Sequence, residues 1–226
     1  MSLLIQLSGV HKHYPDGDVW ALSNIDLSIQ AGEFVSISGP SGCGKSTLLN
    51  MIGAIDRPTS GTVHFQGMLI DDSCDLDRLR SSKIGFVFQS FHLLPNLTAA
   101  ENVQIPMFPT NRAAPDRERR ACDLLALVGL QDRTTHLPGQ LSNGQRQRVA
   151  IARALANEPS LVLADEPTGA LDSTAGDLII DLLRTICQDT GLTLAIVTHD
   201  AKIADAADRK IVMKDGRILS QPQPRG

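Results

Sequence analysis

The stretch EFVSISGPSGCGKSTLLNMIGA, residues 33–54, decides the fold. It begins with an apolar run typical of a buried strand, continues through the glycine-rich loop GPSGCGKST (39–47), and ends in a run with helical character. The loop matches the pattern G-x-x-x-x-G-K-[S/T], and a strand before it with a helix after it is the context that this pattern requires. The stretch therefore predicts a phosphate-binding loop in an α/β protein, and an ordinary glycine-rich turn is a poor alternative.

The residue types in this loop suit a nucleotide triphosphate. Its glycines allow backbone N–H groups to turn inward as a nest for an anion. Lys45 can reach the β- and γ-phosphates, and Ser46 can bind Mg²⁺. The predicted phosphate-binding set is Gly39, Pro40, Ser41, Gly42, Cys43, Gly44, Lys45, Ser46 and Thr47.

Cys43 is the one thiol inside the loop. A thiol beside a helix N-terminus and a lysine is expected to be reactive, so we expect a thiol reagent to modify Cys43 and ATP to block that reaction. The alternative is a small residue that fills a permissive position.

Four apolar runs predict the strands of a buried parallel sheet, separated by helical patterns. They are EFVSIS (33–38), IGFVF (84–88), LVLA (161–164) and LTLAIVT (192–198). The clearest helix covers 173–188, with an apolar face, Ser173 as a possible cap and Gly191 beyond its end.

Other segments predict antiparallel strands and a helical insertion. The first 30 residues and SGTVHFQG (60–67) alternate, and IVMKDGRIL (211–219) carries the Asp-Gly pair of a hairpin. Between the strands at 84–88 and 161–164, helical patterns are broken by QIPMFPTNRAAP, whose three prolines prevent a continuous helix. We therefore expect a core with a β subdomain (1–88 and 161–220), a helical subdomain (89–160) and a disordered tail (221–226).

Composition limits the classes of function. A chain of 226 residues with 42% hydrophobic residues can bury one substantial core, and a net charge of −4 gives no footprint for nucleic acid. No run approaches the roughly 18 to 20 apolar residues of a membrane span, and the start lacks the features of a signal peptide. Four scattered cysteines argue against disulfides and structural zinc. These features predict a cytosolic protein.

Polar residues follow each predicted strand of the parallel sheet. LVLADEPT ends in Asp165 and Glu166, Gln89 follows IGFVF, and His199 follows LTLAIVT. Ligands of open α/β sheets bind at the carboxyl ends of strands, so we expect these groups to converge with the phosphate loop. Asp165 and Gln89 would hold Mg²⁺, Glu166 would polarise the attacking water, and His199 would act at the γ-phosphate. The alternatives are an acidic turn and a structural histidine.

The stretch LSNGQRQRVAIARAL (141–155) opens a helix rich in arginine. Ser142 and Gln145 have the spacing of a capping box, in which each side chain satisfies a backbone N–H group at the helix start. The same helix start is a potential anion site, because its free N–H groups and its dipole favour negative charge.

Taken in order, the phosphate loop, Gln89, LSNGQ, LADEPTGALD and THD resemble the nucleotide-binding subunits of ATP-binding-cassette (ABC) transporters over nearly the whole chain. The resemblance implies a P-loop NTPase (RecA-like) core with a mostly parallel sheet, an antiparallel β subdomain and an inserted helical subdomain. It implies ATP and Mg²⁺ as cofactors, a head-to-tail dimer that encloses two ATP molecules, and an integral membrane permease as partner, with no nucleic acid. The subunit would lie on the cytoplasmic face of the membrane through that permease.

The resemblance also assigns roles to single residues. Ser142, Asn143, Gly144 and Gln145 would face ATP held by the partner copy. Asn143 departs from the family's usual glycine, and we expect it to tune hydrolysis without preventing closure. Tyr14 would stack on adenine, with a core or surface tyrosine as the alternative. Asp172 would communicate across the dimer, with a helix cap as the alternative.

The segment after Gln89 carries four large apolar residues. In the family this region receives a coupling helix of the permease, so Phe91, Leu93, Leu94 and Leu97 would line that groove, unless they form an ordinary core. The run RERR (117–120) is interpreted as a solvated helix face.

Details of the sequence are most similar to the branch of lipoprotein-releasing, macrolide-efflux and cell-division ATPases. The expected function is ATP hydrolysis that drives such a permease. Alternatives are a subunit of a solute importer, a non-transport ABC ATPase, and a regulatory module that binds ATP without turnover.

Overall fold

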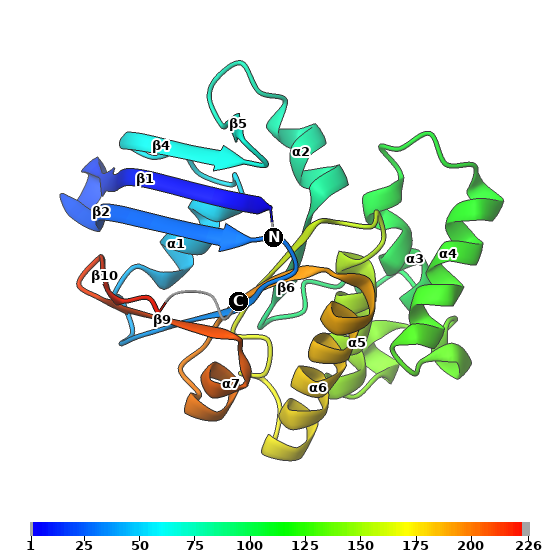
Figure 1. Cartoon of the computed structure of the whole chain (residues 1–226). Coiled ribbons are helices and arrows are strands. Elements are labelled where there is room, and N and C mark those ends of the chain that lie inside the picture. Colours follow the sequence, from blue (N-terminus) through cyan, green and yellow to red (C-terminus); the bar gives the residue numbers. More distant parts are fainter. Residues whose placement is uncertain (1, 223–226) are drawn as a thin grey trace. The chain divides into compact units, whose positions relative to one another are not determined.

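The strand, loop and helix predicted over 33–54 are present in the computed structural model, which describes residues 2–222 (Figure 1). Strand β3 (Phe34–Ser38) is buried except at its last residue and leads into the loop. Helix α1 (Lys45–Ile52) follows, and Gly44 precedes it with a left-handed φ of 99°. A residue with a side chain rarely adopts this conformation, so the glycine marks the point where loop becomes helix.

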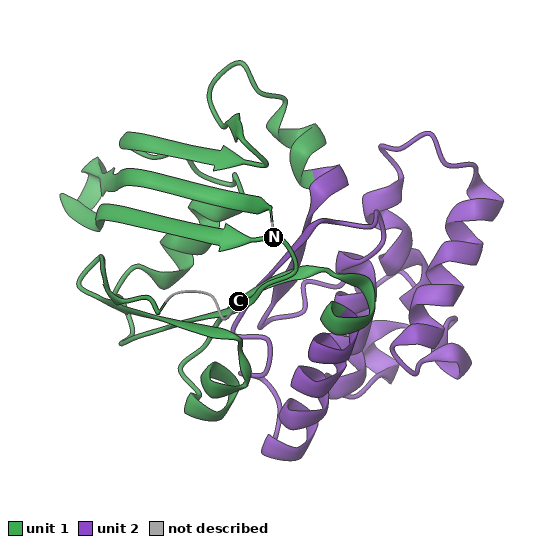
Figure 2. Ribbon diagram, in the orientation of Figure 1, with its two compact units in different colours: residues 1–80, 187–226 green, residues 81–186 purple. Residues whose placement is uncertain are grey.

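The chain divides into two units, which Figure 2 distinguishes by colour: unit 1 comprises residues 1–80 and 187–226, and unit 2 comprises residues 81–186. These limits differ from the boundaries predicted at 89 and 160, because the strands predicted at 84–88 and 161–164 belong with the helical segment. Of the tail predicted to be disordered, residues 223–226 lie outside the described residues, and Gln221 donates a hydrogen bond to the carbonyl of Asp26.

Unit 1 contains an antiparallel sheet with the strand order β2-β1-β4-β5. Its strands are β1 (Leu3–Tyr14), β2 (Val19–Gln30), β4 (Ser60–Phe65) and β5 (Met68–Leu69). A short 3-10 turn, η1 (Pro15–Gly17), joins the first two strands. The antiparallel strands predicted from the alternation in residues 1–30 and 60–67 are confirmed.

The other strands of unit 1 run in the order β10-β9-β3-β8. They add β8 (Thr193–Val197), β9 (Arg209–Lys214) and β10 (Arg217–Ser220). Strand β3 pairs in parallel with β8 and β9, and β9 turns back into β10 through Asp215 and Gly216, both with positive φ as a tight hairpin requires. Helix α7 (Ala201–Ala206) follows β8. The parallel strand and the Asp-Gly hairpin were both predicted.

Unit 2 contains a parallel pair of strands and most of the helices. Strands β6 (Ile84–Phe88) and β7 (Leu161–Asp165) pair in register, with Phe88 opposite Asp165. The helices are α3 (Ala99–Gln104), η2 (Ile105–Met107), α4 (Ala114–Leu127), η3 (Gln131–Arg133), η4 (Pro138–Gln140) and α5 (Asn143–Ala154). The predicted break lies between α3 and α4, where prolines begin η2 and α4.

Two helices extend across the limits of the units. Helix α2 (Leu76–Lys83) leads into β6, and α6 (Ser173–Thr190) follows β7. The predicted cap of α6 was wrong: Ser173 is its first helical residue, and Asp172 caps it by accepting a hydrogen bond from the N–H of Ala175 at 2.9 Å. Among residues 2–222 no helix is both long and apolar enough to cross a membrane.

Candidate nucleotide-binding site

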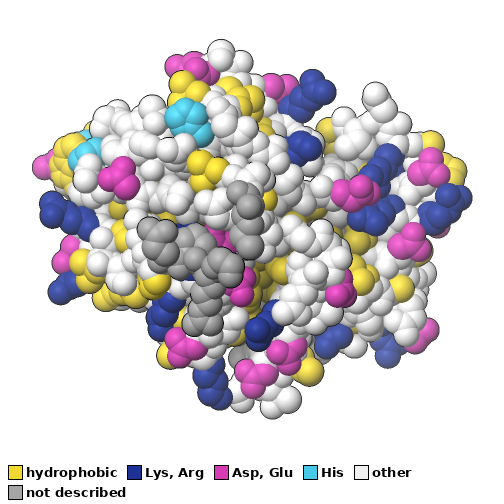
Figure 3. Space-filling view, viewed as in Figure 1, with side chains coloured by type: hydrophobic (Ala, Val, Ile, Leu, Met, Phe, Trp, Pro, Cys, Tyr) yellow, Lys and Arg dark blue, Asp and Glu magenta, His cyan; other side chains and the backbone are white. Residues whose placement is uncertain are grey.

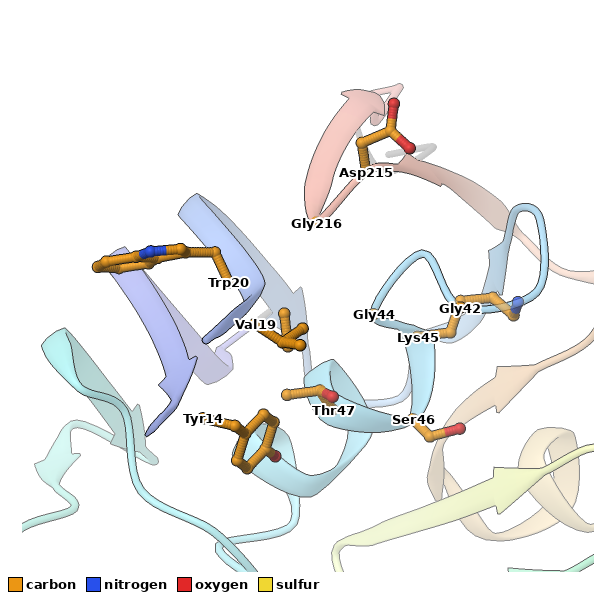
Figure 4. Close-up of a pocket in the computed structure, with 11 residues that line it drawn as sticks. Tyr14, Val19, Trp20, Gly42, Gly44, Lys45, Ser46, Thr47, Asp215 and Gly216 are labelled. Atoms are coloured by element: carbon orange, nitrogen blue, oxygen red, sulfur yellow. The ribbon is translucent and has the colours of Figure 1, made fainter. Parts of the chain in front are cut away.

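A pocket of about 460 Å³ opens in unit 1 between the phosphate loop and the first two strands (Figure 4). Figure 4 shows Tyr14, Val19 and Thr47 together at one end and Lys45 further along the loop. The lining residues are Tyr14, Val19, Trp20, Ala21, Gly42, Gly44, Lys45, Ser46, Thr47, Asp215 and Gly216. The pocket thus joins an aromatic end to an end rich in backbone N–H groups.

The loop is packed so closely that two of its glycines cannot be replaced without displacing backbone. A Cβ atom on Gly39 would lie 2.2 Å from the carbonyl oxygen of Met213, and one on Gly44 would lie 2.4 Å from that of Ala21. Both glycines also have positive φ, 152° and 99°. Side chains are therefore excluded from these two positions, as a close approach of backbone to phosphate oxygens would require.

Lys45 lies across the loop. Its Nζ atom donates to the carbonyl oxygens of Gly39 and Pro40, both at 2.9 Å, and the residue is only 9% exposed. An ammonium carries three N–H donors, so a phosphate oxygen can be a further partner. Ser46, next to it at the start of α1, is exposed in the pocket, where its hydroxyl can serve as an oxygen ligand for a metal.

Cys43 packs inside the loop and is 4% exposed. Its carbonyl accepts a hydrogen bond of 3.1 Å from the N–H of Gly216, and its Sγ lies 2.9 Å from where a Cβ on Gly39 would be. A buried thiol in such a contact is slow to meet a reagent. The packing favours the interpretation of Cys43 as a small filling residue.

The aromatic end of the pocket begins with Tyr14, at the end of β1. Its hydroxyl donates to Oδ2 of Asp56 at 2.9 Å, and Nζ of Lys12 lies 4.9 Å from the centre of its ring. Burial raises the pKa of Tyr14, and the hydrogen bond to Asp56 adds to that rise. Tyr14 is thus held in the pocket lining, and its stacking on adenine stays a prediction.

Five further lining residues were missed by sequence reasoning: Val19, Trp20, Ala21, Asp215 and Gly216. Trp20 is 56% exposed, and its ring centre lies 4.7 Å from that of His13 on the adjacent strand. A tryptophan six residues after Tyr14 on the returning strand was a usable signal. The Asp-Gly turn was predicted as a hairpin, but nothing in the sequence indicated that it lines the pocket.

In unit 1, His199 and the phosphate loop follow the ends of two neighbouring parallel strands, at the same edge of the sheet. Ile37 of β3 is opposite Val197 of β8, and the N–H of Thr198 donates to the carbonyl of Ile37 at 3.1 Å. His199 follows directly and is exposed. The two segments therefore begin at the same edge of these strands, and the action of His199 at the γ-phosphate stays a prediction.

Gln89, Asp165 and Glu166 come together in unit 2. Gln89 follows β6, Asp165 is the last residue of β7 and Glu166 follows it, and the two strands end level with each other. A Cβ on Gly169 would lie 2.7 Å from Nε2 of Gln89, so the glutamine side chain lies against the loop that follows Glu166. Glu166 itself has a left-handed φ of 48°, and such strained backbone gathers at functional sites. The approach of these residues to the phosphate loop stays a prediction.

The start of α5 has the predicted capping box. Oγ of Ser142 accepts from the N–H of Gln145 at 3.3 Å, and the N–H of Ser142 donates to Oε1 of Gln145 at 2.9 Å. The side chain of Asn143 donates from Nδ2 to the carbonyl oxygen of Ala170 at 3.2 Å. Asp172 caps α6, which confirms the alternative given for it, and its role across a dimer stays a prediction.

The segment 89–98 is held by two residues that sequence reasoning missed. The guanidinium of Arg153 donates to the carbonyls of Phe91, at 2.7 Å, and His92, both in left-handed backbone. Asn102, fully buried, accepts from the N–H of Leu94 at 2.8 Å and donates to three carbonyls of the segment.

Of the four apolar side chains predicted for a groove, Leu94 is 51% exposed and Phe91, Leu93 and Leu97 are half-buried. They are not core residues. The basic run 117–120 is a paired helix face, with Arg119 3.5 Å from Asp116 and Arg120 3.8 Å from Glu158. On the face shown in Figure 3, the Lys and Arg side chains of the coloured residues are likewise interspersed with Asp and Glu.

Comparison with known proteins gives consistent results. Residues 22–169 match the family model described as ABC transporter. The chain is 48% identical to the uncharacterized ABC transporter ATP-binding protein MJ0796 of Methanocaldococcus jannaschii, covering 99% of this chain and 98% of that protein. It is 47% identical to the macrolide export ATP-binding/permease protein MacB of Photorhabdus laumondii, covering 97% of this chain and 34% of that protein. A dimeric structure of MJ0796 in a post-hydrolysis state, bound to ADP and Pi, superposes with a TM-score of 0.89 at 46% identity, covering 99% of this chain and 100% of that one.

Proposed function

The chain belongs to the ABC transporter family, and from this premise we propose how its own residues bind and hydrolyse ATP. It is an ATPase subunit that dimerises and drives a membrane permease. The observation that carries the residue assignments is the pocket of unit 1, in which Tyr14 stands at one end and the phosphate loop at the other. A nucleotide needs both an aromatic surface for its base and converging N–H groups for its phosphates.

In this proposal the loop holds the triphosphate. Backbone N–H groups of the loop 39–47, apart from Pro40, surround the β- and γ-phosphates, and Lys45 neutralises part of their charge from its place across the loop. Ser46, Gln89 and Asp165 would hold Mg²⁺ through their side-chain oxygens, and such oxygens are the ligands that this ion prefers. Bound Mg²⁺ supplies charge neutralisation at the phosphate oxygens.

Hydrolysis breaks the bond between the bridging oxygen and the γ-phosphorus and adds water to the phosphorus, giving ADP and phosphate. Glu166 accepts a proton from the attacking water, and His199 orients the γ-phosphate. Positioning and fixed charge then account for most of the rate, because phosphoryl transfer needs little covalent participation by the protein.

The second copy of the chain completes the site. The start of α5 presents N–H groups that the capping box does not fully use, so Ser142, Asn143, Gly144 and Gln145 face the γ-phosphate held by the other copy. Asp172 lies at the loop before α6 and carries the signal between the copies. Two ATP molecules are enclosed in each dimer, which opens after hydrolysis.

The permease partner belongs to the macrolide-export and lipoprotein-release type, placing this subunit on the cytoplasmic face of the membrane. The similarity to the ATP-binding part of MacB proteins supports this choice. The segment 89–98 receives the permease, because it begins with Gln89 and presents Leu94 at its surface.

The test uses a tagged Glu166→Gln protein purified with Mg·ATP from detergent-solubilised cells, with Glu118→Gln as the matched control on the exposed face of α4. We expect Glu166→Gln to lose phosphate release, to persist as an ATP-bound dimer and to retain an integral membrane protein. Glu118→Gln should hydrolyse ATP at the wild-type rate. Rapid turnover by Glu166→Gln would remove this residue from the role of general base, and recovery of soluble partners alone would contradict the permease assignment.

A further inference from the structure

The aromatic end of the pocket is built around a carboxylate that the proposed mechanism does not use. Oδ2 of Asp56 accepts the hydroxyl proton of Tyr14 at 2.9 Å, and Oδ1 accepts from Nζ of Lys12 at 2.6 Å. The same ammonium donates to the carbonyl of Arg57 at 2.9 Å and lies 4.9 Å from the centre of the Tyr14 ring. One carboxylate therefore holds the tyrosine through a hydrogen bond from its hydroxyl and the lysine through an ion pair.

We propose that Asp56 is a positioning residue for nucleotide binding, which holds the ring of Tyr14 at the place where it meets the base of ATP, with Lys12 as its partner. This inference rests on the proposed function of Tyr14. Asp56 contacts the tyrosine and is not among the residues that line the pocket, so in this proposal it acts through the orientation of the ring.

The place of Asp56 in the chain explains why it can do this. It follows α1, and its N–H and that of Ile55 donate to the carbonyl of Asn50 in the last turns of that helix. Helix α1 begins with Lys45 and Ser46 at the phosphate loop. Asp56 thus links the ring on β1 to the helix that carries the phosphate ligands, which fixes the spacing between the base and phosphate ends of the pocket.

The surroundings of Asp56 favour its charged form. Burial is the largest influence on the carboxyl of Asp56 and acts to raise its pKa, but hydrogen bonds from Lys12, the Arg57 N–H and Tyr14 together lower it below its usual value. The Lys12 and Asp56 side chains are 13% and 31% exposed, so water only partly screens the pair. The ammonium over the ring adds a cation–π contact that further restricts the tyrosine.

The test compares ATP with inorganic tripolyphosphate, which has the phosphates but no base. For wild type, Asp56→Ala, Asp56→Asn and the control Asp26→Ala, the KM and kcat for ATP and the inhibition constant of tripolyphosphate are measured by phosphate release. Asp26 is an exposed aspartate that accepts a backbone hydrogen bond from Gly9 in the same sheet, outside the pocket lining. We expect Asp56→Ala to raise KM about tenfold with kcat and tripolyphosphate inhibition unchanged. Asp56→Asn keeps an acceptor for the hydroxyl, so its KM for ATP should rise less than that of Asp56→Ala. Asp26→Ala should have the KM of wild type.

A double-mutant cycle separates positioning from a general effect on the fold. Tyr14→Phe keeps the ring but removes the hydroxyl, so in that background Asp56→Ala should change KM by less than about twofold. Equal weakening of ATP and tripolyphosphate, an unchanged KM, or the full effect in the Tyr14→Phe background would overturn the inference while leaving the ATPase function intact. Absence of ATP turnover in wild type would instead overturn the proposed function, and the inference with it.

Discussion

The side-chain amide of Asn143 donates a hydrogen bond of 3.2 Å to the carbonyl oxygen of Ala170, joining the first turn of α5 to the loop before α6. Glycine, the residue that the resemblance predicts at position 143, cannot make this bond. The amide is therefore directed to the chain's own loop. In the proposed dimer, this bond connects the segment that faces the partner's γ-phosphate to the loop that ends at Asp172.

Replacing Asn143 with glycine should lower kcat about 2- to 10-fold, because one net hydrogen bond contributes roughly 0.5–1.5 kcal/mol to the arrangement of the two segments. Asn143→Ala should behave alike, since it also lacks the amide but avoids the backbone freedom of glycine. Phosphate release gives kcat, and size-exclusion chromatography of each change combined with Glu166→Gln should still show the ATP-bound dimer. Unchanged turnover and ATP affinity in Asn143→Gly would count against this role.

Arg153 should control the order of the segment after Gln89. Its guanidinium serves the carbonyls of Phe91 and His92, and burial lowers its pKa without removing its charge. In Arg153→Met both carbonyls lose their donor while their left-handed backbone remains strained. This should destabilise the folded segment by about 1–3 kcal/mol. We expect faster amide hydrogen exchange over residues 90–98 in this variant.

Arg153→Lys should give an intermediate exchange rate, because an ammonium is a point charge and cannot reproduce the planar fork of arginine. Arg119→Met, on the exposed face of α4, serves as the control and should leave the segment protected. Equal protection in Arg153→Met and wild type would show that Asn102 alone holds the segment.

Sequence reasoning succeeded where the deciding interactions are local. The strand, loop and helix of 33–54 follow from adjacent residues, and the capping box of Ser142 and Gln145 spans one helical turn. The Asp-Gly hairpin is equally local. The same reasoning misplaced the cap of α6, because Asp172 and Ser173 are neighbouring residues that can both cap, and only the backbone conformation decides between them.

Interactions between distant residues gave no such signal. Lys12 and Asp56 are separated by 44 positions, and Arg153 and Phe91 by 62, so no spacing connects them. The limits of the two units depend in the same way on the pairing of β6 with β7 across the helical segment. Residues that hold a functional side chain from elsewhere in the chain therefore had to come from the structure.

Removing one partner of a buried ion pair should strongly destabilise unit 1. Arg209 and Glu33 are 4% and 6% exposed and form two contacts, at 2.6 and 3.0 Å, while Arg209 also donates to the carbonyl of Ser28. Glu33→Ala would leave the guanidinium buried without its partner, so urea unfolding should show a loss of about 3–5 kcal/mol. Asp205→Ala breaks the exposed contact with Lys210 and should cost less than about 1 kcal/mol. Similar losses in both variants would contradict the dependence on burial.

The cysteines should react in the order of their burial, although the sequence predicted a reactive Cys43. Cys74 and Cys122 are partly exposed, whereas Cys43 and Cys187 are buried. Burial, with a contribution from Asp208, raises the pKa of the Cys187 thiol to about 12, so its thiolate is scarce from pH 7 to 9. Mass spectrometry after timed labelling should show Cys74 and Cys122 modified first. Cys43 should follow only when the loop opens, and bound Mg·ATP should slow it further. Labelling of Cys43 as fast as Cys74, or unaffected by ATP, would show that the thiol is reached without opening of the phosphate loop.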